Sequence, residues 1–248
     1  MKTENQGLNS NDIRKPNLVI DMKKKIFIIG IGGLTGSKLV EIGKKDFEIF
    51  GSYNYRDSQS SIVKSVKLDI SNTNKVREIL EEIKPDIVIN TAGINNVDYC
   101  EKYPNEAVKI NVQAVKEICH ITKNIGIKFI QLSSDSVFDG IKQLPYEETD
   151  VTKSINYYGK TKIESEKIVL ENPDNVVVRA SVLYGYLSHN LAQIKSSSKK
   201  SINFGQWLIN KLILNEKVKI ITDEYSSPII VDDFARSILH IIKHEKSG

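Results

Sequence analysis

The stretch Lys25–Gly36, KIFIIGIGGLTG, decides the fold of this 248-residue chain. Its first five residues form an apolar run that breaks at a glycine, which is typical of a buried parallel strand. Gly30, Gly33 and Gly36 then form a GxxGxxG pattern before a helical repeat. Such glycines permit a tight turn and let the backbone approach a pyrophosphate that faces the helix N-terminus. The stretch predicts a strand, a dinucleotide-binding loop and a helix.

Strand-like and helix-like segments alternate through the rest of this half of the chain. We expect strands at residues 25–29, 48–53, 63–70, 85–90, 128–132 and 175–179. The helices between them include one with Ser71 as N-cap and a long amphipathic run from Ala107 to Ile121 that stops at Gly126. Alternation of this kind requires helices on both faces of a parallel sheet. The sequence predicts an α/β fold with a Rossmann-type, doubly wound parallel sheet.

The character of the sequence changes after residue 186. Residues 188–203 are rich in Ser, Lys and Asn, which predicts a loop. We expect a helix at 204–214, a strand at 218–221, an extended piece at 229–231 and a final helix capped by Asp232 or Asp233. The predicted units are a disordered extension at 1–22, a dinucleotide-binding Rossmann domain at 23–185 and a small, partly interleaved substrate-binding lobe at 186–248.

The composition argues against several classes of function. The net charge of +4 and the charged content of 27% are ordinary, and basic and aromatic residues form no stripe, so we expect no nucleic-acid partner. No apolar run approaches the roughly 20 residues of a membrane span, and the first residues lack the core of a signal peptide. We expect no membrane partner and a cytoplasmic location. Cys100 and Cys119 lack a metal or redox spacing, so we expect reduced thiols and no metal site.

Tyr158 and Lys162 stand four residues apart in the stretch YGKTK, which places a phenol and an ammonium on one helix face. Lowering the pKa of a tyrosine from ~10 to about 7 takes roughly 4 kcal/mol, and a nearby lysine cation is a common source of it. The pair suggests proton transfer, although this spacing also arises by chance on amphipathic helices. Ser134, in the stretch SSDSVFDG at the end of the fifth strand, lies where parallel sheets bind ligands.

These motifs together resemble a known family. The glycine loop, the NTAG stretch at 90–93, Ser134, and Tyr158 with Lys162 are similar to the extended short-chain dehydrogenase/reductases that act on sugar nucleotides. Residues 133–140, 158–162, 179–185 and 226–233 are most similar to dTDP-4-dehydrorhamnose reductase. The similarity covers roughly residues 23–243. It implies an oxidoreductase of polysaccharide biosynthesis that acts on a CH–OH/C=O group.

The resemblance implies a role for each matching residue. Tyr158 would donate the proton, Lys162 would bind the nicotinamide ribose and lower the pKa of Tyr158, and Ser134 would hydrogen-bond the substrate carbonyl. Asn111 would orient a water or a backbone group. The implied cofactor-binding residues are Gly30, Gly32, Gly33, Leu34, Gly36, Arg56, Asp69, Ile70, Ala92, Gly93 and Lys162. The implied substrate-binding residues are Ser134, Asp135, Ser136 and Val182.

Arg56 indicates which nicotinamide cofactor is expected. It follows the second strand, about 20 residues beyond Gly36, where a basic residue would pair with the 2′-phosphate of NADPH. Asp57 beside it leaves NADH open, because a carboxylate there would bind the ribose hydroxyl of NAD. We expect NADPH as cofactor, a sugar nucleotide as substrate and a homodimer as the candidate assembly.

Two substrate positions depart from the family pattern. Ser136 and Val182 replace the Tyr and Trp that these reductases usually carry, which leaves the identity of the sugar open. The C-terminal lobe is also expected to be abbreviated. The leading hypothesis is reduction of a nucleotide-linked 4-keto-6-deoxy sugar. The alternatives are an NADP-binding regulatory or sensor protein, similar to the regulatory subunit of methionine adenosyltransferase, and a sugar-nucleotide epimerase or dehydratase.

Overall fold

A computed structural model describes residues 23–55, 62–186 and 203–248. The predicted extension at 1–22 and Arg56 lie outside the described residues. The central sheet has six strands in the order β3-β2-β1-β4-β5-β6, and every neighbouring pair is parallel. The strands are β1 (Lys25–Ile29), β2 (Glu48–Tyr53), β3 (Lys64–Lys67), β4 (Ile87–Asn90), β5 (Lys128–Ser134) and β6 (Val176–Ala180). The predicted doubly wound parallel sheet is confirmed.

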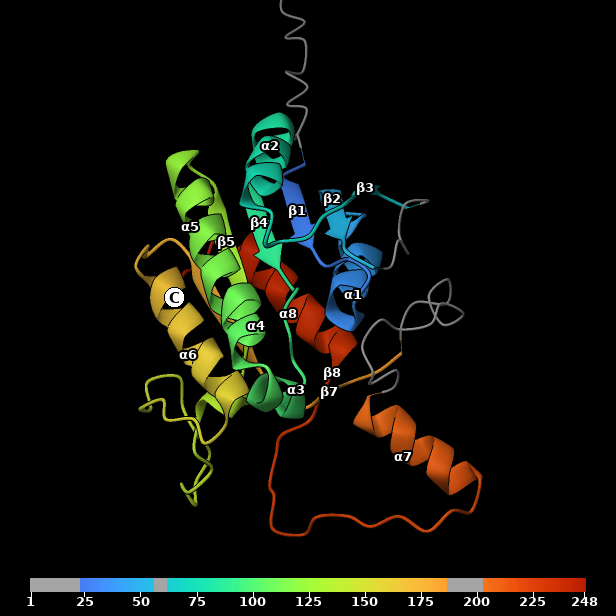
Figure 1. The fold of residues 1–248 in the computed structure, drawn as a ribbon. Coiled ribbons are helices and arrows are strands. Elements are labelled where there is room, and N and C mark those ends of the chain that lie inside the picture. The colour runs from blue at the N-terminus through green and yellow to red at the C-terminus, as the bar shows by residue number, and fades with distance from the viewer. Residues whose placement is uncertain (1–22, 56–61, 187–202) are drawn as a thin grey trace, which may run out of the picture.

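Helices cover both faces of the sheet (Figure 1). One face carries α1 (Leu34–Gly43) and α8 (Val231–Lys243), which pack against each other and bury Leu39, Phe234 and Ile238. The other face carries α2 (Thr73–Ile83), α5 (Ala114–Asn124) and α6 (Tyr157–Leu170). The order of strands reverses between β1 and β4, so the carboxyl ends of these two strands form the crevice in which such sheets bind ligands.

The long helix predicted around residues 107–121 contains a π-helical turn. The chain forms α3 (Val97–Lys102), then α4 (Pro104–Val108), with its proline at the first helical turn. The π turn η1 (Lys109–Gln113) joins α4 to α5 without a break and buries Asn111. π turns of this kind insert a residue into a helix and are frequent at functional sites.

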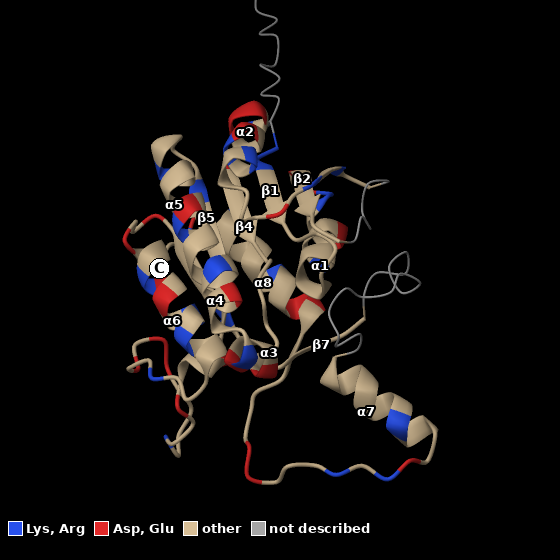
Figure 2. Ribbon diagram, in the orientation of Figure 1, with Lys and Arg blue, Asp and Glu red and all other residues tan. Residues whose placement is uncertain are grey.

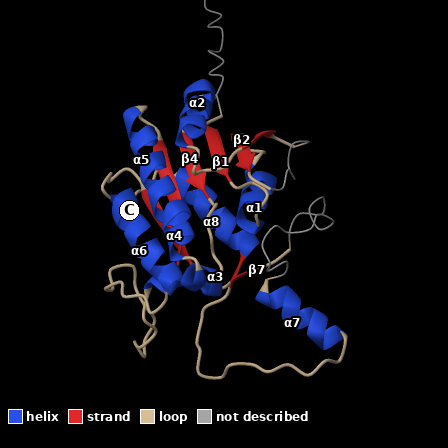
Figure 3. Cartoon of the chain, viewed as in Figure 1, coloured by secondary structure: helices blue, strands red, loops and turns tan. Residues whose placement is uncertain are grey.

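The segment that follows β6 leaves the main sheet. Strands β7 (Leu183–Tyr184) and β8 (Ile229–Ile230) form a separate parallel pair, and α7 (Phe204–Ile213) lies beside β7. Figure 3 shows the long loop that joins α7 to β8. The last helix, α8, packs on α1, the first helix of the described chain. The division into domains at residue 185 stays a prediction.

Three local predictions are wrong. The strand expected at 218–221 does not form, because no neighbouring strand pairs with it in the described chain, and its Ile220 and Ile221 are exposed. The N-cap of α2 is Asn72, whose Oδ1 accepts the amide of Lys75 at 3.1 Å, rather than Ser71. The aspartates 232 and 233 lie inside the first turn of α8, where they face the positive helix end without capping it.

The charges are spread over the surface of the molecule. Figure 2 shows basic and acidic residues interspersed along the outer helices. Within the described ranges, no helix combines the length and the apolar character that crossing a bilayer would require. Cys100 and Cys119 are both free, as predicted, and Cys100 is buried.

Candidate active site

Tyr158 and Lys162 lie on the first two turns of α6, on one face, as the four-residue spacing predicts. Asn156 caps this helix, and its Oδ1 accepts the amide of Gly159 at 2.8 Å. The Nζ atom of Lys162 lies 5.8 Å from the centroid of the Tyr158 ring. The structure therefore brings the predicted phenol and ammonium together.

Gly159 allows α6 to start close against the chain that follows β5. A Cβ atom at this position would lie 2.0 Å from the backbone oxygen of Ser136 and 2.1 Å from Oγ of Ser154. Real Cβ atoms do not approach other atoms this closely, so only glycine fits without a shift of the backbone. The glycine of the YGKTK stretch thus fixes Tyr158 next to the segment that holds Ser134.

Lys162 is a buried cation. Its Nζ donates a hydrogen bond to the carbonyl oxygen of Leu132 on β5 at 3.0 Å. Burial lowers the pKa of Lys162 to about 8, while the charges of Glu166 and Cys100 oppose that shift. A lysine with such a pKa can change its protonation state near neutral pH, which suits a group that assists proton transfer.

The pKa of Tyr158 moves in the direction opposite to the prediction. Burial raises it to about 12, the hydrogen bond with Ser134 acts to lower it, and the Asp135 carboxylate raises it further. Desolvation is the largest influence on this pKa, and the Lys162 ammonium, 5.8 Å from the centroid of the ring, does not reverse the shift. In the chain by itself Tyr158 therefore holds its proton firmly, as a general acid must before it donates.

Ser134 belongs to a cluster of hydroxyl groups around one carboxylate. Its Oγ lies 3.0 Å from Oδ1 of Asp135 and 3.1 Å from Oγ of Ser136. Ser181 donates to the other oxygen of Asp135 at 2.6 Å. The predicted substrate residues Ser134, Asp135 and Ser136 therefore form one polar group beside Tyr158. Val182 follows Ser181 with a φ of 24°, an uncommon conformation for a β-branched residue.

Asn111 on the π turn hydrogen-bonds to the backbone of Ile94, and its predicted role in orienting a water or a backbone group stays a prediction. Its Oδ1 accepts the amide of Ile94 at 2.8 Å, and its Nδ2 donates to the oxygen of Ile94 at 2.9 Å and to Oγ1 of Thr161 at 3.1 Å. A Cβ added to Gly93 would lie 3.0 Å from Oδ1 of Asn111 and 3.8 Å from Nζ of Lys162. The loop after β4 is thus held directly beside α6, which carries Tyr158 and Lys162.

The glycine loop has the features of a pyrophosphate site. Gly30 has a φ of 92°, and a Cβ on Gly36 would lie 2.3 Å from the oxygen of Gly30, so the loop and α1 meet at glycine contacts. The N-cap of α1 is Gly33, without a side-chain cap and without an acidic residue in the first turn. Gly32 and Leu34 are half-buried beside it. Uncapped amides at a helix N-terminus bind anions, so these residues fit a dinucleotide.

The predicted adenine side is arranged less uniformly. Asp69 is exposed, and its Oδ1 accepts the amide of Ser71 at 2.9 Å. Ile70 is buried in the core that α2 and α5 cover, so most of its side chain packs inside the protein. Ala92, after β4, donates its amide to Oδ1 of Asn90 at 3.1 Å. The predicted contact of Arg56 with a 2′-phosphate lies outside the described residues.

Two polar pairs near the site, one buried and one partly buried, were not predicted. Asn90 donates to Gln131 at 2.9 Å between adjacent strands, and Gln131 donates to the Leu132 oxygen that also binds Lys162. Arg179 binds Glu166 through two hydrogen bonds, of 2.9 and 2.8 Å. The only signal in the sequence was the presence of polar residues inside otherwise apolar strands and on the face of α6 that carries Lys162.

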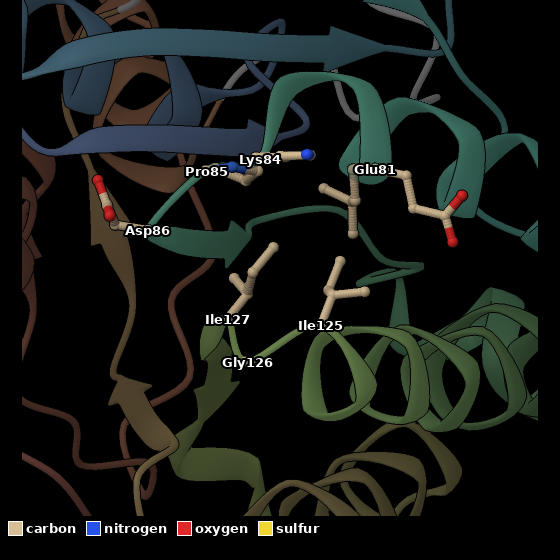
Figure 4. Close-up of a pocket in the computed structure, with 8 residues that line it drawn as sticks. Glu81, Lys84, Pro85, Asp86, Ile125, Gly126 and Ile127 are labelled. Carbon is tan, nitrogen blue, oxygen red and sulfur yellow. The ribbon is translucent and has the colours of Figure 1, made fainter.

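A surface hollow lies at the amino ends of the strands, on the side of the sheet opposite to the carboxyl ends (Figure 4). Its volume is about 510 Å³, and its lining includes Glu81 and Lys84 from the end of α2 and Ile125 and Ile127 after α5. These residues adjoin the amino ends of β4 and β5. In open parallel sheets ligands bind at the carboxyl ends, where Ser134 and the glycine loop lie, so we do not assign the hollow to the active site.

Comparison with known proteins shows that the chain is similar to reductases. A probable low-salt glycan biosynthesis reductase from Haloferax volcanii is 30% identical over 224 residues, 90% of this chain and 72% of that protein. The dTDP-4-dehydrorhamnose reductase of Salmonella typhimurium is 29% identical over 176 residues, 71% of this chain. The match spans 54% of the Salmonella enzyme, less than two thirds of its length.

A solved structure supports the same relation. The dTDP-4-dehydrorhamnose reductase of Bacillus anthracis, in complex with NADP, superposes with a TM-score of 0.76 at 28% identity. That alignment covers 92% of this chain and 73% of the other. The model of the RmlD substrate binding domain matches residues 23–248, which is all of the chain outside the predicted extension. The chain therefore belongs to the RmlD substrate binding domain family.

Proposed function

We propose that this protein is an NADP-dependent reductase of a nucleotide-linked 4-keto-6-deoxy sugar. The observation that carries the proposal is the convergence of Ser134, Tyr158 and Lys162 beside an uncapped glycine loop, in a family whose members include dTDP-4-dehydrorhamnose reductases. NADPH, when bound, supplies the hydride. The glycine loop binds its pyrophosphate, Ala92 and Gly93 flank its inner half, and Lys162 holds its nicotinamide ribose.

The residues of the chain handle the proton. Ser134 donates a hydrogen bond to the substrate carbonyl oxygen and orients it toward Tyr158. Tyr158 transfers its phenolic proton to that oxygen as the carbonyl carbon is reduced, which converts the ketone into an alcohol. The Lys162 ammonium stabilises the phenolate that remains. Asp135, Ser136 and Val182 border the space that the sugar would occupy.

Turnover of the purified full-length chain tests this proposal. Oxidation of NADPH at 340 nm should depend on a ketosugar nucleotide, and NADH should be a poorer donor. Tyr158→Phe should reduce the rate by about 10²–10⁴-fold, the usual contribution of a general acid. Tyr157→Phe, which changes the neighbouring residue of α6, is the matched control and should retain activity.

Three other results would contradict the proposal. Unchanged turnover in Tyr158→Phe would remove the tyrosine from the mechanism. Interconversion of sugars without net consumption of NADPH would indicate an epimerase or dehydratase. Tight NADP binding without turnover on any sugar nucleotide, together with a co-purifying enzyme, would indicate a regulatory protein. The proposal also includes a cytoplasmic location and a homodimer, which fractionation and analytical ultracentrifugation test.

A further inference from the structure

Glu166 is a buried carboxylate one helical turn beyond Lys162. The two residues are spaced i, i+4 on α6, so their side chains lie on the same face of the helix. The Glu166 side chain is 5% exposed. A carboxylate this deeply buried needs a partner, because a buried charge without one is strongly destabilising. Glu164 is nearer to Lys162 in sequence but is exposed, whereas Glu166 lies on the same buried face of α6 as Lys162.

Arg179 on β6 is the partner of Glu166. Its Nε and Nη2 atoms donate to the two carboxylate oxygens at 2.9 and 2.8 Å, which is the bidentate geometry of strong ion pairs. Its Nη1 donates to the backbone oxygen of Glu148 at 3.1 Å, and its guanidinium lies 5.1 Å from the centroid of the Phe138 ring. These contacts fix the guanidinium in one position behind Glu166.

We propose that the Glu166–Arg179 ion pair is a positioning device that sets the charge state of Lys162. The carboxylate of Glu166 favours the ammonium form of Lys162, and the guanidinium of Arg179 limits this attraction by neutralising the carboxylate. Neither residue touches the reacting atoms. The catalytic meaning of this proposal rests on the proposed function, whereas the electrostatic relation does not.

The other groups around Lys162 help to predict the direction in which each variant should shift its pKa. Cys100 on α3 interacts with Lys162, Tyr158 on α6 presents its ring, and β5 contributes the neutral carbonyl of Leu132. Glu166 acts to raise the pKa of Lys162 against the effect of burial. Loss of the negative charge at Glu166 should therefore lower that pKa further. Loss of the positive charge at Arg179 should raise it, because a more negative environment favours the ammonium.

Removal of the negative charge of Glu166 and removal of the positive charge of Arg179 should thus shift the pKa of Lys162 in opposite directions. We would label the protein with [13Cε]lysine, omit the cofactor, and follow the Lys162 resonance against pH, assigning it by its absence in Lys162→Met. Glu166→Gln should lower the midpoint by about half a pH unit or more, and Arg179→Met should raise it by a similar amount. Arg179→Lys, which keeps the cation, should return the midpoint toward that of the wild type. Glu164→Gln, on the exposed face of α6, is the matched control and should leave it unchanged.

Midpoints that do not move, or that move in the same direction in Glu166→Gln and Arg179→Met, would overturn the proposal and leave the pair with a structural role. If Arg179→Met does not fold, the comparison of Glu166→Gln with Arg179→Lys still tests the proposal. Only Glu166→Gln should shift the titration midpoint of Lys162. The alkaline limb of kcat should follow the same shifts in each variant. Absence of turnover in the wild type would refute the proposed function without affecting the titration.

Discussion

Helices α6 and α7 contrast in composition and in burial. On α6 the polar residues Thr161, Lys162, Ser165 and Glu166 are all buried, and the most accessible of them is 7% exposed. On α7 no residue is buried, and Leu212 and Ile213 are 60% and 72% exposed. Hydrophobicity alone would assign the opposite positions to the two helices. Polar residues are buried in α6 because each has a hydrogen-bond or ionic partner there, whereas α7 presents apolar residues for which the described chain supplies few neighbours.

The contrast separates two kinds of information in the sequence. If a buried, fully paired polar group loses its partner, the protein loses stability. The side chains of such groups are therefore held in defined positions. An exposed apolar residue contributes little to folding, because it is equally exposed in the unfolded chain. The following variants should therefore have large effects in α6 and small effects in α7.

Removal of the buried charge of Lys162 should have the largest effect on stability. The pKa of Lys162 falls from 10.5 in its ordinary environment to about 8 here, so the unfolded chain binds more protons between these values, and stability should rise with pH from about 8 to about 10. Lys162→Met should add about 2–3 kcal/mol to the free energy of unfolding at pH 7 and remove this pH dependence. Urea denaturation at several pH values measures it. Lys160→Met, on the exposed face, is the control, and an unchanged pH slope in Lys162→Met would contradict the prediction.

Addition of a methyl group at the start of each helix should distinguish them next. Gly159→Ala would place a Cβ 2.0 Å from the oxygen of Ser136. It should destabilise the protein by about 1–3 kcal/mol and reduce turnover by displacing Tyr158. Gly205→Ala in α7 would place a Cβ 3.3 Å from Cβ of Tyr184 and 3.5 Å from Oδ1 of Asn203, and it should change stability by less than about 1 kcal/mol. Thermal melts of the two variants give the comparison, and equal effects would contradict it.

Loss of one buried hydroxyl in α6 should have a moderate effect. Oγ1 of Thr161 accepts from Asn111 at 3.1 Å and donates to the oxygen of Tyr158 at 2.7 Å. Thr161→Val leaves one hydrogen of Asn111 without this partner and should cost about 1–2 kcal/mol. Chemical denaturation measures the change. A variant as stable as the wild type would show that the hydroxyl is dispensable.

Truncation on α7 should have the smallest effect. Leu212 is 60% exposed, so Leu212→Ala should change the free energy of unfolding of the isolated chain by less than about 0.5 kcal/mol. The same denaturation experiment measures it. A loss above 1 kcal/mol would show that α7 is packed against something in solution, for example a second copy of the chain, and dilution would then restore the small value.

The sequence predicted the fold better than the environment of the site. The strands β1 and β2 have the predicted bounds because each is a short apolar run ended by glycine or turn residues. The expected strand at 218–221 failed because a strand needs a neighbour, which local composition does not report. The positions of Tyr158 and Lys162 on one face followed from helical periodicity, but the raised pKa of Tyr158 depends on burial, which only the assembled structure determines.

Contacts between distant segments were also beyond prediction. Glu166 and Arg179 lie on a helix and on the next strand, and nothing in either stretch indicates that they meet in a bidentate pair. The position of the glycines between β1 and α1 was predictable from the sequence, whereas their contact with a pyrophosphate stays a prediction. The contribution of Arg56 to the choice between NADPH and NADH stays a prediction.

The π turn at Lys109–Gln113 makes the site sensitive to the number of residues as well as to their kind. A π turn holds one residue more than an α-helical turn, so a deletion of one residue there would restore regular α-helical winding. Each residue of an α-helix turns the chain by about 100°, and the deletion would rotate Asn111 away from Ile94 and Thr161. In related proteins, insertions and deletions in this segment, as well as substitutions, would therefore show which of them keep the contacts of Asn111.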